Sequence, residues 1–336
     1  MPDPVASLLR HFHRQRPIRG GSLLITIFGD SIAPRGGAVT LGSLISLARP
    51  FGLPERLVRT SVARLAVDGW LAARRDGRRS EYRITPAGRD RFAAATRRIY
   101  GAIPDSWSGQ WTLLVLPPPN GSRRQDIRDE LRWLGFGQIS PGVFAHPNWS
   151  VEEARAGLKD VEGAAAGVLL KSSSEGSEAD RRLVAAGWDL GDLTRRYQRF
   201  VEIFTPIANA IGPVAADGSN TADETSTTTD EAAFIIRTLL IHEYRKIHLQ
   251  DPLLPPALLP ADWVGAAAYD LSRRLYSAVF RAAERYVSNT ATTTAEPLPT
   301  ADSSAYARFG GLDHLENDDM AQLAPNPAQV RRAARQ

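Results

Sequence analysis

An Asp-Gly dipeptide between two short, arginine-rich extended runs constrains the fold of this 336-residue chain more than any other feature. The runs are Leu71–Arg75 and Glu81–Ile84, and Asp76-Gly77 lies between them. Such a dipeptide between extended runs is a strong signal for a two-stranded hairpin. The hairpin follows three segments with helical periodicity, so residues 20–103 are predicted to form a small module of helices and one hairpin.

Each of the three preceding segments carries its apolar residues on one helical face. The first segment covers residues 22–32. Thr40 is the expected N-cap of the second helix, which ends near Pro50, and Pro54 fits the first turn of the third. The third helix is predicted to turn four apolar residues inward: Val58, Val62, Leu65 and Ala66. Its opposite face is left to solvent or to a partner.

Charge is distributed unevenly along the chain. Residues 1–103 contain 18 arginines, no lysine and seven acidic residues, a net charge of +11. The other 233 residues contain 23 basic and 30 acidic residues, a net charge of −7. A basic module on an acidic body is typical of a protein that binds a polyanion with one end.

Three helices followed by a basic hairpin predict a winged helix-turn-helix that binds double-stranded DNA. The third helix would enter the major groove and the hairpin would contact phosphates or the minor groove. The predicted helix contacts are Arg56, Arg59, Thr60, Ser61 and Arg64, with Arg59 and Arg64 reading bases. The predicted wing contacts are Arg74, Arg75, Arg78 and Arg79. Two alternatives stay open: a winged helix that binds protein, and merely solvated charges on a helical domain.

Several motifs, taken in order, resemble the PaaX family of bacterial repressors. The first region contributes SLLITIFGDSI (22–32), LVRTSVARLAVDGWL (57–71) and YRITPAG (82–88). The middle region contributes WTLLVLP (111–117), LRWLGFG (131–137) and SPGVFAHPN (140–148). The last region contributes LLIHEYRKIHLQDPLLPPALLP (239–260). The resemblance covers roughly residues 17–287, and it rests on the order of the motifs rather than on any one of them.

The resemblance implies a homodimeric transcriptional repressor of aromatic-acid catabolism, such as phenylacetate degradation. It implies release from operator DNA by an aryl-CoA thioester, phenylacetyl-CoA. The implied architecture is α+β, with a central ferredoxin-like domain at 104–180 and a C-terminal helical effector or dimerisation domain at 181–287. The local pattern agrees with strands at 111–116, 138–144 and 166–171 and helices at 123–134 and 151–157. Residues 212–231 are expected to form a disordered acidic insert, and 288–336 a flexible tail.

An acyl-CoA effector needs cations for its phosphates and an apolar slot for its aryl group. Two predicted helices, 188–204 and the one that follows the acidic insert, offer arginines beside apolar seams. The candidate effector contacts are Trp133, Trp188, Arg195, Arg199, His242, Arg245 and Lys246. Each of these residues has a structural interpretation as well, as a core aromatic or an exposed charge.

The sequence predicts no catalytic site, metal site or cofactor. His242-Glu243 would need a second histidine at position 246 to bind zinc, and that position is Lys246. A metal nuclease related to the central domain would need a carboxylate where its first strand ends, and the chain continues there as Leu116-Pro117. No cysteine is present, and no apolar signal segment or membrane span is found, so a cytoplasmic protein is expected. The remaining alternatives are a regulator of another pathway and a DNA-directed nuclease with a divergent metal site.

Overall fold

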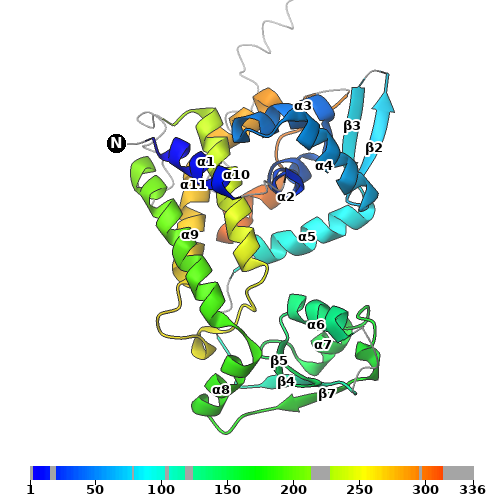
Figure 1. Ribbon diagram of the computed structural model, residues 1–336, viewed down its shortest axis with the longest axis vertical. Helices are drawn as coiled ribbons and strands as arrows, with labels where there is room; N and C mark the ends of the chain where they lie inside the picture. The colour runs from blue at the N-terminus through cyan, green and yellow to red at the C-terminus, as the bar shows by residue number, and fades with distance from the viewer. Residues whose placement is uncertain are drawn as a thin grey trace, which may run out of the picture. The chain divides into compact units, whose positions relative to one another are not determined.

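The computed structural model describes residues 3–15, 20–77, 79–102, 106–117, 124–212, 228–294 and 297–312 (Figure 1). Contacts divide the chain into two compact units that are not consecutive in sequence. The first unit comprises residues 1–101, 201–244 and 269–336, and the second comprises 102–200 and 245–268. The N-terminal module and much of the C-terminal region thus belong to one unit. Arg78, residues 213–227 of the expected acidic insert and residues 313–336 lie outside the described residues.

Three helices and a small sheet form the N-terminal part of the first unit. They are α2 (Gly20–Ile27), β1 (Ala38–Thr40), α3 (Leu41–Ala48), α4 (Glu55–Val67), β2 (Leu71–Asp76) and β3 (Arg79–Ile84). The predicted hairpin is confirmed, because β2 and β3 pair antiparallel with Leu71 opposite Ile84. Strand β1 was not predicted, and it pairs with the other edge of β3. Thr40 is the predicted N-cap: its side chain accepts a hydrogen bond from the Ser43 amide.

Further helices pack in the first unit. They are α1 (Pro4–Arg14), α5 (Pro86–Tyr100), α12 (Ser303–Tyr306) and most of α10 (Asp230–His248) and of α11 (Gly265–Thr290), with the second half of α9 (Leu190–Ile211). Helix α2 continues into a π-helical turn, η1 (Phe28–Ile32), and then into a 3-10 turn, η2 (Ala33–Arg35). The expected single helix over 22–32 therefore widens in its last turn, where it carries a buried carboxylate.

That carboxylate, Asp30, is 1% exposed and lies at the centre of a buried polar network. Its Oδ1 accepts hydrogen bonds from the hydroxyls of Tyr100 and Tyr276 at 2.8 and 2.9 Å. Arg308 donates to the same oxygen at 3.0 Å, and Arg237 lies 3.0 Å from Oδ2. Asp30 thereby joins η1 to α5, α10, α11 and the segment after α12.

A second carboxylate, Glu284 of α11, extends this network. It accepts from Arg237 at 2.6 Å and from Arg35 at 2.5 Å. Burial lowers the pKa of Arg237, but Asp30 and Glu284 raise it further, so the guanidinium stays charged. Burial, reinforced by the charge of Asp30, raises the pKa of Tyr100 well above its ordinary value, so the phenol remains a hydrogen-bond donor. The network is therefore a set of fixed charges and donors inside the first unit.

The prediction of a flexible tail from residue 288 is wrong for the part that the structure describes. Residues 288–290 complete α11, and residues 297–312 return to the core. Phe309 is 2% exposed, and its ring lies edge-on to Tyr100 at 5.2 Å. Arg308 is 3% exposed because it pairs with Asp30. A few anchoring side chains hold the segment in place. It has no apolar periodicity, so the sequence pattern does not predict this packing.

The second unit is built on a four-stranded antiparallel sheet. Its elements are β4 (Trp111–Val115), α6 (Arg124–Trp133), β5 (Gly137–Ser140), β6 (Val143–His146), α7 (Val151–Gly157), β7 (Val168–Ser172) and α8 (Ser177–Gly187). The strand order is β5-β6-β4-β7. One prediction needs correction, because the single strand expected at 138–144 is a hairpin. Pro141-Gly142 forms its turn, and Gly142 has a φ of +79°, which favours glycine.

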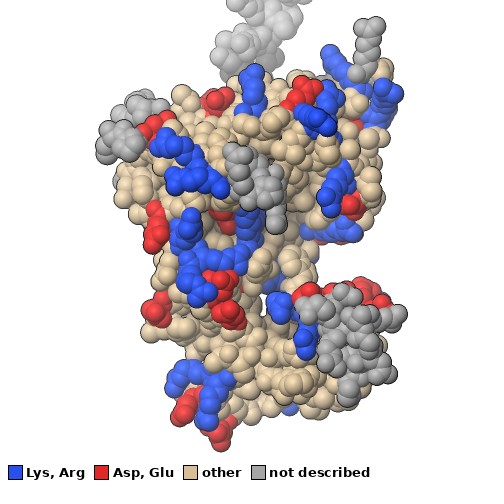
Figure 2. Space-filling model, in the orientation of Figure 1, with Lys and Arg blue, Asp and Glu red and all other residues tan. Residues whose placement is uncertain are grey.

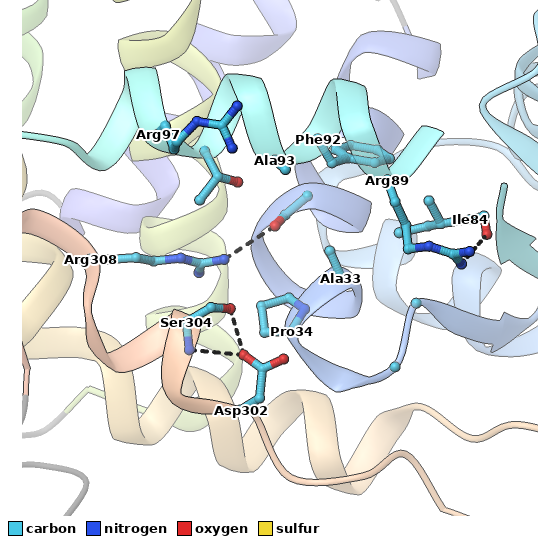
Figure 3. Close-up of a pocket in the computed structure, with 14 residues that line it drawn as sticks. Ala33, Pro34, Ile84, Arg89, Phe92, Ala93, Arg97, Asp302, Ser304 and Arg308 are labelled. Atoms are coloured by element: carbon cyan, nitrogen blue, oxygen red, sulfur yellow. Dashed lines mark hydrogen bonds between the residues drawn. The ribbon is translucent and has the colours of Figure 1, made fainter. Parts of the chain in front are cut away.

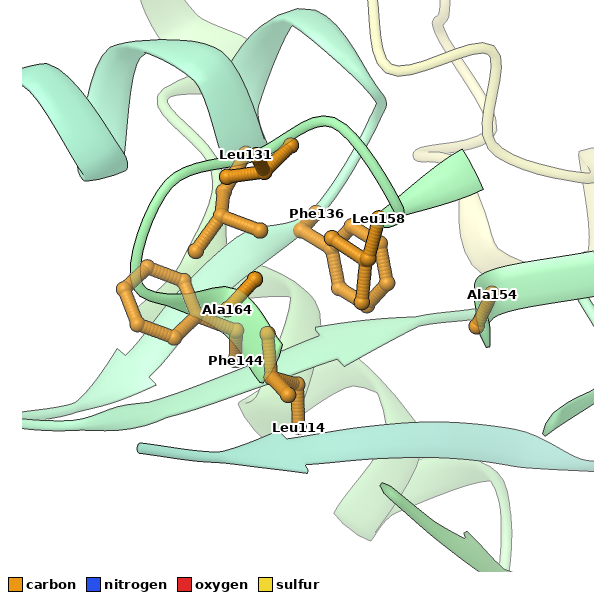
Figure 4. Close-up of a cluster of buried hydrophobic side chains, with 8 residues drawn as sticks. Leu114, Leu131, Phe136, Phe144, Ala154, Leu158 and Ala164 are labelled. Atoms are coloured by element: carbon orange, nitrogen blue, oxygen red, sulfur yellow. The ribbon is translucent and has the colours of Figure 1, made fainter. Parts of the chain in front are cut away.

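Both faces of this sheet are partly covered. Leu114 points to one face, where it packs with residues from α6, α7 and β6, including Leu131 and Phe144 (Figure 4). Trp111, on the same strand but at the alternate side-chain position, packs on the other face with Val184 of α8. At one end of this second face, three apolar side chains are at least 36% exposed: Val115, Val168 and Leu170. An apolar patch therefore lies beside the edge strand β7.

Glu81 of β3 predicts how the first unit responds to acid. Its 3% exposed carboxylate accepts from the backbone and hydroxyl of Thr294, both at 3.0 Å, and from Arg83 at 3.0 Å. The bond from the Thr294 amide lowers the pKa of Glu81 below 4.5, with Arg83 assisting, although burial opposes the shift. A lowered pKa stabilises the fold above pH 4.5, and that stabilisation is lost as the pH falls through the folded-state value.

Replacing this carboxylate with an amide should remove the response. At about pH 7 we expect Glu81→Gln to unfold at lower urea concentration than the parent protein, with the gap narrowing towards about pH 3.5. The measurement is the urea midpoint of both proteins at the two pH values. An equal gap at both would show that the Glu81 carboxylate does not contribute to the acid sensitivity.

Candidate DNA-binding surface

Helix α4 is held by its apolar face. Val58 and Val62 are fully buried and Leu65 is 6% exposed, as the i, i+4, i+7 spacing predicts. Helix α2 approaches closely at Gly20, where a Cβ atom would lie 2.9 Å from Leu57 Cγ. Pro54 precedes the first turn in extended backbone conformation. The helix is therefore fixed in rotation, and its opposite face is presented to solvent.

The outward face of α4 carries the predicted contacts Arg56, Arg59, Thr60 and Arg64, and all four are exposed. Spacings of three, four and eight residues place them on one side of the helix. The Arg64 side chain is 84% exposed, 3.9 Å from Asp68. The Arg59 side chain is 55% exposed and is held by Glu55 at 2.6 Å. Exposed guanidinium groups on one side of a helix can pair with phosphates or with the edge of guanine.

Ser61 does not belong to this surface. It is only 9% exposed, and its Oγ would lie 3.0 Å from a Cβ atom at Gly20. Position 61 falls between Val58 and Leu65 on the inward side of the helix. The prediction of Ser61 as a DNA contact is therefore wrong, because its small side chain allows α2 to pack against α4.

The hairpin places further arginines beside α4. Arg74, Arg75 and Arg79 are all exposed, whereas the predicted contact Arg78 lies outside the described residues. In the register of the two strands, Arg74 lies opposite Glu81 and Arg75 lies opposite Ser80. Because neighbouring residues of a strand alternate between faces, the two arginines point to opposite faces of the hairpin. Figure 2 shows basic side chains gathered over the region of β2 and β3, at the upper right. Helix face and hairpin together form a surface of mobile cations suited to a polyanion.

The seven candidate effector contacts have varied environments: His242 is buried, and Trp188 is half-buried and packs against a core cluster. His242 is 2% exposed and its Nδ1 lies 3.0 Å from the Thr26 hydroxyl. Trp188 packs 6.1 Å from Trp111, against the backbone of Gly137. The packing therefore favours a structural role for these two residues over a role in effector binding.

The other five candidates lie at or near the surface of the second unit. Trp133 is 49% exposed at the end of α6. Arg195 is 70% exposed and pairs with Asp192 at 3.2 Å, and Arg199 is exposed as well. Arg245 and Lys246 are half-buried, and the Lys246 carbonyl accepts from Arg196 at 2.6 Å. Their role in binding an effector stays a prediction.

The parts of the chain that the structure describes contain neither a cluster suited to a metal ion nor a helix suited to a membrane. Across those parts of the chain, no group of three or more histidine, aspartate or glutamate side chains is placed to hold a metal ion. None of the helices that the structure describes is both long and apolar enough to cross a membrane.

Comparison with known proteins accounts for most of the chain. PaaX-like protein matches residues 19–88, PaaX protein central Cas2-like domain matches 104–184, and PaaX-like protein C-terminal domain matches 188–289. The transcriptional repressor PaaX of Escherichia coli (strain K12) is 35% identical over 321 residues, covering 94% of this chain and 98% of that protein. An uncharacterized protein of Mycobacterium tuberculosis is 22% identical, with a TM-score of 0.46 over 73% of this chain and 89% of that one. With a curated relative this similar over nearly its whole length, the chain belongs to the PaaX family.

Proposed function

We propose that the chain is a transcriptional repressor that binds operator DNA in the cytoplasm through a winged helix-turn-helix. The observation that carries the proposal is the exposed arginine and threonine face of α4 beside the arginine-bearing hairpin. In this proposal α4 is the recognition helix in the major groove, and β2–β3 is the wing along the phosphates. Membership of a repressor family makes the protein a regulator and not an enzyme.

The repressor would act as a homodimer, with the second unit as its ferredoxin-like central domain. The β-α-β-β-α-β order of β4 to β7 and their strand order support this assignment. The exposed patch of Val115, Val168 and Leu170 supports self-association, since exposed apolar side chains on the edge strand β7 and on its neighbour β4 favour a partner. A dimer would place its two recognition helices about 34 Å apart, or a multiple of that, on an inverted repeat.

The regulated genes would be those of an aromatic-acid catabolic operon, such as phenylacetate degradation, with phenylacetyl-CoA as the releasing ligand. The family resemblance supports this assignment, and a regulator of another pathway with another ligand is the alternative. In either case the ligand must bind better to the form that does not bind DNA, because only differential affinity shifts the population.

The test is a gel shift on DNA from upstream of the protein's own gene, with phenylacetyl-CoA, free phenylacetate or neither. We expect specific binding that the thioester releases and phenylacetate does not. Binding that the thioester leaves unchanged would keep the repressor and reject this ligand. Absence of specific binding at every salt concentration would reject the repressor and favour a winged helix that binds protein.

A further inference from the structure

A cavity of about 440 Å³ lies within the first unit, on the side of α5 that faces η1 and η2. Figure 3 shows Ala33 and Pro34, the α5 side chains and the Asp302–Ser304 turn around it. Its volume falls within the range of roughly 300–1,000 Å³ that small-molecule sites occupy. None of the seven effector candidates from the sequence lines this cavity.

Three arginines contribute to the cavity lining, with one acid. Arg89 and Arg97 are exposed on α5, eight residues or about 12 Å apart, and Arg308 is 3% exposed. Among the described residues Arg97 has no ion-pair or hydrogen-bond partner for its guanidinium, and the buried Nε of Arg308 has no hydrogen-bond partner. The acid, Asp302, uses its Oδ1 to cap α12 through Ser304. Because Arg308 is already paired with Asp30, Arg89 and Arg97 against Asp302 leave the lining positive by one charge, which favours an anion.

The rest of the lining is largely apolar. Ile84, Phe92 and Pro34 supply large apolar surfaces, and Ala93 leaves room beside them. Gly36 has a φ of +82°, and a Cβ atom there would meet nothing within 4 Å. Guanidinium groups beside an apolar wall suit an organic anion with a phosphate or carboxylate next to a flat hydrophobic group.

The cavity also touches the elements that position the DNA-binding surface. Ile84 is the last residue of β3, opposite Leu71 of β2. The ring centroids of Phe92 and Trp70 lie 5.2 Å apart, and Trp70 directly precedes the hairpin. Arg308 links the cavity to Asp30 in η1, directly after α2. A ligand here would contact the base of the hairpin and compete with Asp30 for Arg308.

We propose that this cavity is the effector site, and that it binds the anionic, apolar ligand class to which aryl-CoA thioesters belong. The proposal rests on the repressor function proposed above. In this proposal Arg89, Arg97 and Arg308 bind the ligand. The contacts of the cavity with β3 and η1 then couple ligand binding to the release of DNA.

The test measures phenylacetyl-CoA binding to the full-length protein by calorimetry, with coenzyme A and phenylacetate as separate probes. Arg97→Gln should raise the Kd for the thioester by about tenfold or more, because it removes a charge-assisted bond. Ala93→Trp should act similarly by filling the cavity. The matched control is Arg91→Gln, on the same helix but against Trp70 outside the cavity, and it should leave the Kd unchanged. Comparing the two smaller probes shows which end of the thioester the arginines bind.

Gel shifts on the same variants separate this proposal from the repressor function. The expected result is unchanged operator binding without ligand and resistance to release by the thioester. If parent and cavity variants bind the thioester and release DNA alike, the site is rejected and the repressor stands. If Arg97→Gln instead weakens DNA binding with no effect on thioester binding, Arg97 is a phosphate contact and the effector-site proposal fails. If the parent binds none of the three probes, both the site and the effector class are rejected.

Discussion

Asp30→Ala should lower the free energy of unfolding by about 3–5 kcal/mol, the usual cost of leaving a buried charge without its partner. Arg237 would keep Glu284 at 2.6 Å, whereas Arg308 would lose the carboxylate that it contacts at 3.0 Å. The Tyr100 and Tyr276 hydroxyls would lose their shared acceptor as well. Since whole domains are stable by about 5–15 kcal/mol, thermal or urea unfolding should show the loss clearly.

A control variant and a double variant test whether this loss of stability comes from the buried charge. Asp270→Ala removes an exposed carboxylate of α11, 4.0 Å from Arg273, and should cost no more than about 1 kcal/mol. Adding Arg308→Leu to Asp30→Ala should cost less than the sum of the two single changes, because the second removes the unpaired cation. Strictly additive losses would show that Asp30 stabilises the unit by packing rather than by charge.

This network marks the limit of what local sequence patterns predict. Asp30 is separated by 246 residues from Tyr276 and by 278 from Arg308, and no periodicity links positions that far apart. The same holds for the cavity, whose arginines come from α5 and from a segment expected to be a flexible tail. Burial of Arg308 follows from tertiary pairing alone, so the sequence gives no sign of it.

Features set by neighbours in sequence were predicted well. The hairpin at Asp76-Gly77, the Thr40 cap and three of the four predicted inward residues of α4 depend on turn chemistry and on helical period, and all are present, whereas Ala66 is only half-buried. The prediction for Ser61 fails because a small polar residue fits either face of a helix, and only the approach of Gly20 decides which. The single strand predicted at 138–144 overlooks the turn at Pro141-Gly142, which divides the apolar run into two paired strands.

Arg64→Ala should weaken operator binding by about 1–3 kcal/mol and relax specificity at one base position. The Arg64 side chain is 84% exposed, and its distance of 3.9 Å from Asp68 leaves it available to a base edge. Arg59→Ala should cost less, because the parent residue must first leave Glu55 at 2.6 Å. The measurement is affinity for the operator and for variants with one base pair changed.

A wing substitution should behave differently from these. Arg75→Ala is expected to weaken all DNA sequences alike and to reduce the slope of log K against log salt by about one, since it removes a phosphate contact. Arg182→Ala, a 68% exposed arginine on α8 paired with Glu178, carries the same loss of charge and should change neither quantity. The assignment of α4 as the recognition helix depends on this contrast. If Arg64→Ala and Arg75→Ala weakened every sequence equally, α4 would be a phosphate-binding surface and the bases would be read elsewhere.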